Sequence, residues 1–366
     1  MRNRCLVAAI VLGLTCLSAG CDKASSVTVV NDPNVIRNAS EIFGPAIDLN
    51  PSPVTSADPA GVNPTASDPL SQEPGPETSA TPSPDTTKAA APARMPYDEA
   101  AIKAIIEDIV ASTDFTALAQ DFPDSYEFRN DGIRRVCIDA GHQGKGVVYG
   151  DVSKREPVGP NAVLNPDNPR ENTNPQVAYG AEGVSTKAAE SELVLEVALK
   201  LEQELKDRGY EVVMVRRSED VFITNAQRAL IGNKTDCDIS LHIHMDSFED
   251  STGKYNPDTV GGAHCMYTTA ENEFVPYLSD YNYALADYVI NAYCNATGYR
   301  LRTGNSERDG MSALNWSSIP TTLIEMGFLS NHAEDEEMNT EEFQLKAARA
   351  IADGIDQYFD YMENRE

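Results

Sequence analysis

Positive charge is scarce in this sequence. The 366 residues include 29 Lys and Arg against 57 Asp and Glu, so the formal net charge is -28 and the pI is about 4.4. Binding to nucleic acid, or electrostatic binding to anionic lipid, needs a surplus of basic side chains. The composition therefore excludes nucleic-acid partners and indicates an acidic surface that keeps the protein soluble.

Closely spaced cysteine pairs are also missing. The seven cysteines form no CxxC pair, which argues against a zinc ribbon and against a thioredoxin-like redox site. Three of the seven lie in the first 21 residues, and the others are Cys137, Cys237, Cys265 and Cys294. Two interpretations of these four stay open: one disulfide in an exported protein, or four buried free thiols.

The apolar run near the N-terminus, Cys5 to Leu17, is too short to span a bilayer comfortably and has the length of a signal-peptide core. Residues 17–21, Leu-Ser-Ala-Gly-Cys, resemble a bacterial lipobox, although Ser18 stands where leucine is usual. We expect a signal peptide over 1–20 and a lipid anchor to the cell membrane through Cys21. An ordinary cleaved signal and an uncleaved anchor stay open, and both would also place the rest of the chain outside the cytoplasmic membrane.

The next segment, 21–96, has no sustained hydrophobic period and holds thirteen of the chain's 22 prolines. Such a segment cannot bury enough apolar area to offset its ordering entropy, so we predict a disordered tether. Apolar residues then recur at helical spacing over 97–112. We assign 97–132 to a helical connector and 133–366 to a single catalytic domain.

The domain 133–366 alternates short apolar strands with amphipathic helices. The expected strands are 133–139, 210–215, 239–243, 263–267 and 321–325, and the expected helices are 190–208, 226–233, 279–297 and 341–362. This order predicts an α/β fold, an open twisted mixed sheet with helices on both faces. In such sheets, functional residues gather beyond the carboxyl ends of the strands.

Several residues suited to metal binding or proton transfer lie at those ends. His142 follows the first strand, His242 sits near the end of the third, and Glu325 ends the fifth. A carboxylate at the end of an apolar strand needs a partner or a role, because its burial is costly. Structural interpretations stay open: His142 as a turn residue, and His242 with His244 as a core pair on one strand face. Glu190 opens a helix, where the helix dipole favours a carboxylate in any case.

Four motifs follow one another along this domain. They are Asp139-Ala140-Gly141-His142, Glu190 with Leu195 and Ala198 behind it, Ser240-Leu241-His242, and Glu325-Met326-Gly327-Phe328-Leu329-Ser330-Asn331. Their order and spacing resemble the zinc-dependent N-acetylmuramoyl-L-alanine amidases, in the form of the type 3 amidase catalytic domain. The resemblance covers about 133–362.

That resemblance implies one Zn²⁺ per chain, held by His142, Glu190 and His242, with Glu325 as the catalytic carboxylate. The implied substrate is peptidoglycan, cut at the amide bond between N-acetylmuramic acid and L-alanine. Two imidazoles and one carboxylate leave zinc an open position for water, whose pKa zinc lowers to roughly 7. Glu325 would take a proton from this water and pass it to the departing amine.

The sequence departs from the family pattern after the last motif histidine. The family usually has a small residue and then Asn there, whereas this chain has Ile243 and His244. His244 is therefore a reserve ligand or an outer hydrogen-bond donor. We expect His264 and His332 to be structural or surface residues. The polar insertion 148–182 is either a lid or specificity loop, or a tolerated insertion.

Two other functions stay open: a zinc peptidase that cuts a different cell-wall amide bond, and a catalytically silent domain that binds peptidoglycan. Retention of Glu325 weighs against the silent domain, because binding alone does not need that carboxylate. The tether lacks the repeats and aromatic pattern of a cell-wall-binding module. We therefore expect targeting to depend on the lipid anchor, and the sequence identifies no activator or inhibitor protein.

Overall fold

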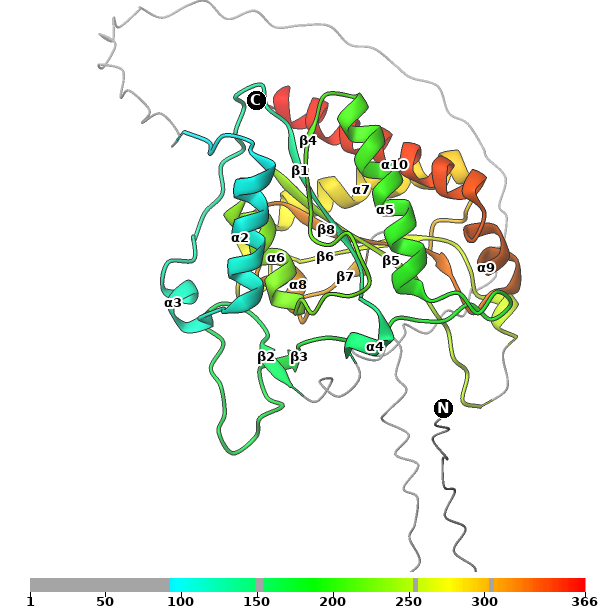
Figure 1. Ribbon diagram of the computed structural model, residues 1–366, viewed down its shortest axis with the longest axis horizontal. Coiled ribbons are helices and arrows are strands. Elements are labelled where there is room, and N and C mark those ends of the chain that lie inside the picture. Colours follow the sequence, from blue (N-terminus) through cyan, green and yellow to red (C-terminus); the bar gives the residue numbers. More distant parts are fainter. Residues whose placement is uncertain (1–92, 149–153, 253–255, 303–305, 366) are drawn as a thin grey trace, which may run out of the picture. The chain divides into compact units, whose positions relative to one another are not determined.

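The computed structural model describes residues 93–148, 154–252, 256–302 and 306–365 (Figure 1). The expected signal peptide, the lipidation site Cys21 and nearly all of the expected tether lie outside the described residues. Within the described part of the chain, no helix is long and apolar enough to cross a membrane.

A mixed six-stranded sheet lies at the centre of the fold, as predicted. Its strands are β1 (Arg135–Ala140), β4 (Glu211–Met214), β5 (Ile239–Asp246), β6 (His264–Tyr267), β7 (Ser306–Glu307) and β8 (Thr321–Phe328). They are arranged in the order β4-β1-β5-β8-β6-β7. The first four of this order run parallel, whereas β6 is antiparallel to β8 and parallel to β7. A separate antiparallel pair joins β2 (Arg155–Pro157) and β3 (Thr173–Pro175).

Helices cover both faces of the sheet, which confirms the predicted α/β architecture. The longer helices are α2 (Glu99–Ala111), α5 (Glu190–Asp207), α6 (Asn225–Lys234), α7 (Ser279–Thr297) and α10 (Glu341–Glu363). The shorter ones are α3 (Phe115–Gln120), α4 (Lys145–Val148), α8 (Ser312–Asn315), α9 (His332–Met338) and the 3-10 turns η1 (Pro257–Thr259) and η2 (Pro276–Leu278). In Figure 1, α5, α7 and α10 lie together over one face, and α2 and α6 lie side by side over the other.

The long elements match their predicted positions closely. Helix α7 has the predicted bounds, and Gly298 ends it in the left-handed region at φ 82, which a residue without a Cβ adopts freely. Strands β5 and β8, however, run about three residues further than predicted. Their last residues pair with each other, Asp246 with Phe328, beyond an irregularity in the register. In β5 the predicted strand stopped too early because the polar residues His244 and Asp246 follow, yet both remain paired with β8.

The two faces of the central strands differ in polarity. On β5, Ile239, Leu241, Ile243 and Met245 pack into the main core together with α5, α7 and α10. The alternate residues of β5 therefore face α2, α6 and α8. The register places Asp139 beside His242, and His244 beside Glu325. The fold thus gathers the chemically active side chains on one face, near the carboxyl ends of three neighbouring parallel strands.

The four cysteines of the domain are free. Cys137, Cys237 and Cys265 are buried, and Cys294 is half-buried. The structure therefore agrees with the interpretation of free thiols and contains no disulfide among these four cysteines.

A buried carboxylic acid ties β2 to the start of α6. Glu156 on β2 is 1% exposed, and its Oε1 accepts a hydrogen bond of 2.9 Å from the backbone N of Ala226. Burial raises the pKa of Glu156 to about 8, against the opposing hydrogen bonds from Thr224 and Ser312. This side chain therefore keeps its proton at neutral pH in the folded protein.

The Glu156→Gln variant should lose part of the pH dependence of stability. In the unfolded chain Glu156 ionises near pH 4.5, whereas the folded chain keeps this proton up to about pH 8. Across that window the unfolded state holds fewer protons, so the free energy of unfolding falls as the pH rises. Urea titrations of the zinc-free protein at pH 5.5 and pH 8 measure this effect. The free energy of unfolding of the variant, relative to that of the parent protein, should be about 2 kcal/mol higher at pH 8 than at pH 5.5. An equal difference between the two proteins at both pH values would contradict this role of Glu156.

Candidate metal centre and active site

Three side chains form a compact group that could hold a metal ion: His142, Glu190 and His244. One ligand atom of each lies within 4.8 Å of the others. The two oxygens of Glu190 divide between the histidines, with Oε2 3.2 Å from His142 Nε2 and Oε1 3.0 Å from His244 Nδ1. The two rings stand nearly perpendicular, with 4.8 Å between their centroids. Two imidazoles and one carboxylate converge on one point.

The loop after β1 orients His142. Its backbone has φ 58, in the left-handed region. The Nδ1 atom lies 3.0 Å from the carbonyl oxygen of Ala178. A carbonyl only accepts, so Nδ1 carries the proton and Nε2 keeps its lone pair. A metal-ligating histidine is typically held in this way by a hydrogen bond to its second nitrogen.

Glu190 stands at the first position of α5 and is buried. Its two oxygens also accept backbone hydrogen bonds, one of 2.8 Å from Ala181 N and one of 3.1 Å from Met245 N. Burial alone would raise the pKa of Glu190, but the neighbouring rings of His142 and His244, at 3.2 and 3.0 Å, outweigh burial. They hold this pKa well below its usual range, so the group is a carboxylate.

His244 lies over a glycine. A Cβ at Gly141 would come within 2.3 Å of the His244 ring, so no larger residue fits at that position without displacing the histidine. The glycine of the Asp-Ala-Gly-His motif therefore leaves the space through which His244 reaches Glu190.

The predicted ligand His242 lies outside this group, so the structure brings together a different trio from the predicted one. Its Nδ1 lies 2.8 Å from Asp139 Oδ2, and Asp139 in turn pairs with Arg228 at 2.5 Å. His242 and His244 share one face of β5, but His242 is two residues nearer the amino end of the strand. At that depth its neighbour is Asp139, whereas His244 is level with Glu325. The reserve candidate His244 is thus the histidine that joins His142 and Glu190.

Glu325 shares a small cavity with both histidines of the group. The cavity has a volume of about 30 Å³, and its other lining residues are Asp139, Asn174, Ala178, Asn225, Arg228, His242, Met311, Ser312, Ala313 and Leu323. Glu325 is 1% exposed, and its Oε2 has no hydrogen-bond partner among the described residues. Burial, with the negative charges of Asp246 and Glu190, raises the pKa of Glu325 well above its usual range. This carboxyl group is therefore suited to holding and releasing a proton.

The insertion 148–182 contributes to this cavity. Asn174 and Ala178 line it, and the backbone groups of Ala178 and Ala181 bind His142 and Glu190. At least its second half therefore forms part of the wall around the candidate metal centre.

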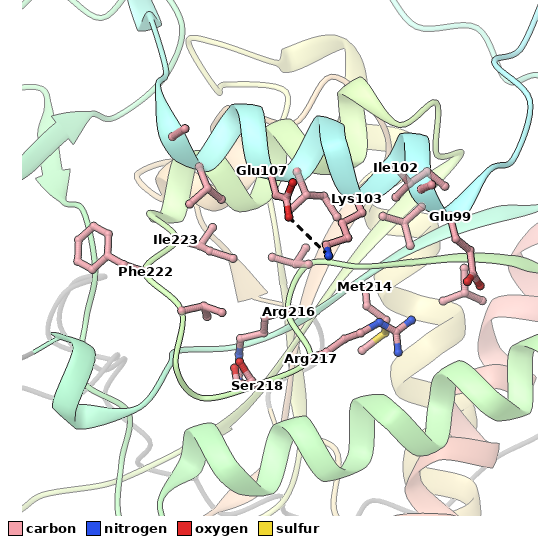
Figure 2. Close-up of a pocket in the computed structure, with 18 of the residues that line it drawn as sticks. Glu99, Ile102, Lys103, Glu107, Met214, Arg216, Arg217, Ser218, Phe222 and Ile223 are labelled. Carbon is pink, nitrogen blue, oxygen red and sulfur yellow. Dashed lines mark hydrogen bonds and ion pairs between the residues drawn. The ribbon is translucent and has the colours of Figure 1, made fainter.

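A much larger hollow, of about 1020 Å³, lies between α2 and the edge strand β4. Figure 2 shows it, with Lys103 and Glu107 paired at 3.7 Å along α2 on one side of the hollow. Its lining includes none of the predicted site residues, and α2 in turn contributes no residue to the small cavity. A choice of active site by cavity volume alone would therefore select a hollow that contains none of the predicted site residues.

The remaining histidines lie apart from the metal group. His264 is buried, and its Nε2 is 4.0 Å from Asp246 Oδ2, while burial lowers the pKa of His264 to about 3. His332 is on the surface, with its Nδ1 2.7 Å from Asp258. These positions agree with the structural and surface roles expected for them.

Sequence reasoning missed the arginine that supports the site. Arg228 of α6 donates to Asp139, to the backbone oxygen of His142 and to the side-chain oxygen of Gln143. Asp139 could have been found, because it begins the Asp-Ala-Gly-His motif and is a charged residue in a buried strand. Arg228 gave no such signal, since an arginine on an amphipathic helix is usually solvated.

Comparison with known proteins identifies the family of this chain. The family model described as N-acetylmuramoyl-L-alanine amidase matches residues 136–357. The amidase AmiC of Neisseria meningitidis is 29% identical over an alignment of 196 residues, and the match covers 46% of this chain and 47% of AmiC. An uncharacterized Bacillus subtilis protein, YqiI, is 28% identical over 171 residues, which are 47% of this chain and 75% of YqiI. This chain thus matches about half the length of AmiC.

A solved structure shares the fold. The N-acetylmuramyl-L-alanine amidase Ami1 of Mycobacterium smegmatis superimposes with a TM-score of 0.52 at 20% identity, covering 64% of this chain and 99% of Ami1. The family match spans more than half of the sequence and contains all the residues of the candidate metal centre. This chain therefore belongs to the N-acetylmuramoyl-L-alanine amidase family.

Proposed function

We propose that this protein hydrolyses the amide bond between N-acetylmuramic acid and L-alanine in peptidoglycan. In this proposal His142, Glu190 and His244 hold one Zn²⁺, and Glu325 is the catalytic carboxylate. The observation that carries the proposal is the convergence of two imidazoles with the Glu190 carboxylate, where both imidazoles share a cavity with the unpartnered carboxyl group of Glu325. Family membership supplies the substrate class.

The residues present fit zinc. Two histidine nitrogens and one carboxylate oxygen are the ligand set of many catalytic zinc sites, which leave a fourth position open. His142 Nε2 is buried and has no well-aligned hydrogen bond among the described residues, and its ring is held from the far side by Ala178. Glu190 is ionised and oriented by two backbone N–H groups. Both features suit atoms that coordinate a cation.

The chain's own residues would divide the work of hydrolysis. Bound zinc supplies a Lewis acid, which lowers the pKa of water to roughly 7 and polarises the amide carbonyl. Glu325 accepts a proton from the attacking water and returns it to the nitrogen of L-alanine, because an amide nitrogen leaves poorly unless it is protonated. The buried surroundings of Glu325 raise its affinity for a proton, which favours the uptake of the proton from the attacking water.

Export and anchoring complete the proposal. The basic start, the short apolar run and the sequence Leu-Ser-Ala-Gly-Cys at residues 17–21 support lipidation of Cys21 outside the cytoplasmic membrane. Labelling of cells with a radioactive fatty acid tests this step, since a Cys21→Ser variant should carry no label. Label that persists in the variant would remove Cys21 as the anchor.

The proposed activity is tested by digesting purified peptidoglycan with the full-length chain in detergent. Mass spectrometry should find stem peptides with a free N-terminal L-alanine. Their release should stop on chelation and return when zinc is added.

Three results would contradict the proposal. Cleavage at another amide bond would make the protein a cell-wall peptidase. Release that survives chelation would remove zinc from the mechanism. No release from a protein that carries zinc would indicate a silent binding domain.

A further inference from the structure

The Nε2 atom of His242 belongs to a side chain that lines the active-site cavity, and the mechanism proposed above assigns it no role. The side chain is fully buried and lines the cavity together with His244 and Glu325. Its Nδ1 is engaged by Asp139 at 2.8 Å, whereas its Nε2 has no hydrogen-bond partner among the described residues. A buried polar atom without a partner is costly unless it serves a function.

The hydrogen bond between Nδ1 and Asp139 determines whether Nε2 of His242 donates or accepts a hydrogen bond. Burial opposes the ionisation of Asp139, but Arg228 and His242 outweigh burial and hold the pKa of Asp139 well below its usual range. An ionised carboxylate only accepts hydrogen bonds, so Nδ1 of His242 carries the proton. With the proton of Nδ1 directed at Asp139, the unpartnered Nε2 is the atom that can present a lone pair to the cavity. Among the described residues, His242 thus offers the cavity an acceptor that does not belong to the metal group.

The size of the cavity indicates what this acceptor would bind. Its volume of about 30 Å³ exceeds the roughly 10–15 Å³ that one water molecule needs, but it is far too small for a sugar or a peptide. A buried water requires two to four polar partners. Glu325 Oε2 is a second unpartnered acceptor on the same wall. Two acceptors match the two hydrogens of a single water molecule.

We propose that His242 Nε2 accepts a hydrogen bond from the water that attacks the amide, so that His242 and Glu325 together orient this water. With one O–H directed at each acceptor, a lone pair of the oxygen is free to face the carbonyl carbon. Glu325 takes the proton as the new C–O bond forms, and His242 keeps its own proton on Nδ1 throughout. This inference rests on the proposed function and adds a positioning residue to it.

A matched pair of variants separates the water contact from the contact with Asp139. In His242→Asn the amide nitrogen can still donate to Asp139, but the side chain ends short of the cavity. In His242→Gln the side-chain oxygen can reach the place of Nε2. We expect kcat to fall roughly 100-fold in the Asn variant, with KM and zinc content unchanged. The Gln variant should recover at least tenfold of that loss.

NMR spectroscopy tests the proposed protonation of the His242 ring without any measurement of catalysis. In the zinc-free protein, ¹⁵N spectra of the imidazole nitrogens should show His242 protonated at Nδ1 and bare at Nε2. The chain has five histidines, so comparison with the Asn variant assigns the signals. A proton on Nε2 would overturn the proposal.

The kinetic results discriminate as well. A kcat within threefold of the parent protein in the Asn variant would overturn the role, and so would loss of zinc, which would make His242 a ligand. Equal losses in both variants, together with a lower melting temperature, would leave only a structural role. If the parent protein releases no peptides that begin with L-alanine, the proposed function fails first, and this inference fails with it.

Discussion

The Glu325→Gln variant should lose at least about 1,000-fold in kcat while it keeps its fold and its zinc, since general acid–base catalysis contributes roughly 10²- to 10⁴-fold. Glutamine has nearly the shape of the glutamate side chain but cannot take up and release the proton. The change also removes a buried acid beside Asp246 and Glu190, so the melting temperature should not fall. Release of stem peptides from peptidoglycan, followed at saturating substrate, measures the loss.

Glu156→Gln is the matched control for this experiment. Glu156 is also a buried acid with a raised pKa, but it does not line the cavity. We expect its kcat to remain within threefold of that of the parent protein. Turnover that survives in Glu325→Gln would remove Glu325 from proton transfer, and a loss of similar size in Glu156→Gln would show that the assay responds to general damage.

The sequence was sufficient for the long elements and for two of the three group members. Amphipathic periodicity located α5, α7 and α10, because each buries a continuous apolar stripe against the sheet. His142 and Glu190 could be found because both stand at the junction of a strand or helix with a loop, within recognisable motifs. Short elements such as β2, β3 and α8 were missed, since three or four residues carry no readable period.

The choice between His242 and His244 was beyond the sequence for a physical reason. Alternation along a strand tells which face a residue occupies, and both histidines occupy the same face. It does not tell how far along the strand the neighbouring groups lie. That depth is set by the register of β5 against β1 and by the room above Gly141. Both are properties of segments about a hundred residues apart.

One sequence signal favours His244 over His242. The family pattern has Asn two positions after its metal histidine, and the residue two positions after His244 is Asp246, which differs from Asn in a single polar group. Other contributions left no signal at all. The oxygen of Ala178 and the nitrogen of Ala181 hold His142 and Glu190, and backbone groups are the same in every residue type.

Of the two histidines on β5, His244 and not His242 should have the larger effect on metal binding when it is replaced. Removal of one of three protein ligands should weaken zinc binding at least about 100-fold, a loss comparable to that from His142→Ala. His242→Asn should keep one zinc per chain, because its hydrogen bond to Asp139 lies outside the ligand group. Metal analysis after dialysis against a competing chelator gives the stoichiometry, and titration with a fluorescent zinc chelator gives the affinity.

The melting temperature of each zinc-free variant separates loss of a ligand from loss of the fold. The His244 ring covers Gly141, and its removal should leave a small void with a modest cost in stability. A His242 variant that loses zinc while His244→Ala retains it would restore the ligand set implied by the family resemblance. Retention of zinc by both would point to a metal site that does not use β5. Loss in His244→Ala alone would assign this ligand to the histidine that lies level with Glu325, where a zinc-polarised carbonyl and the proton acceptor would meet.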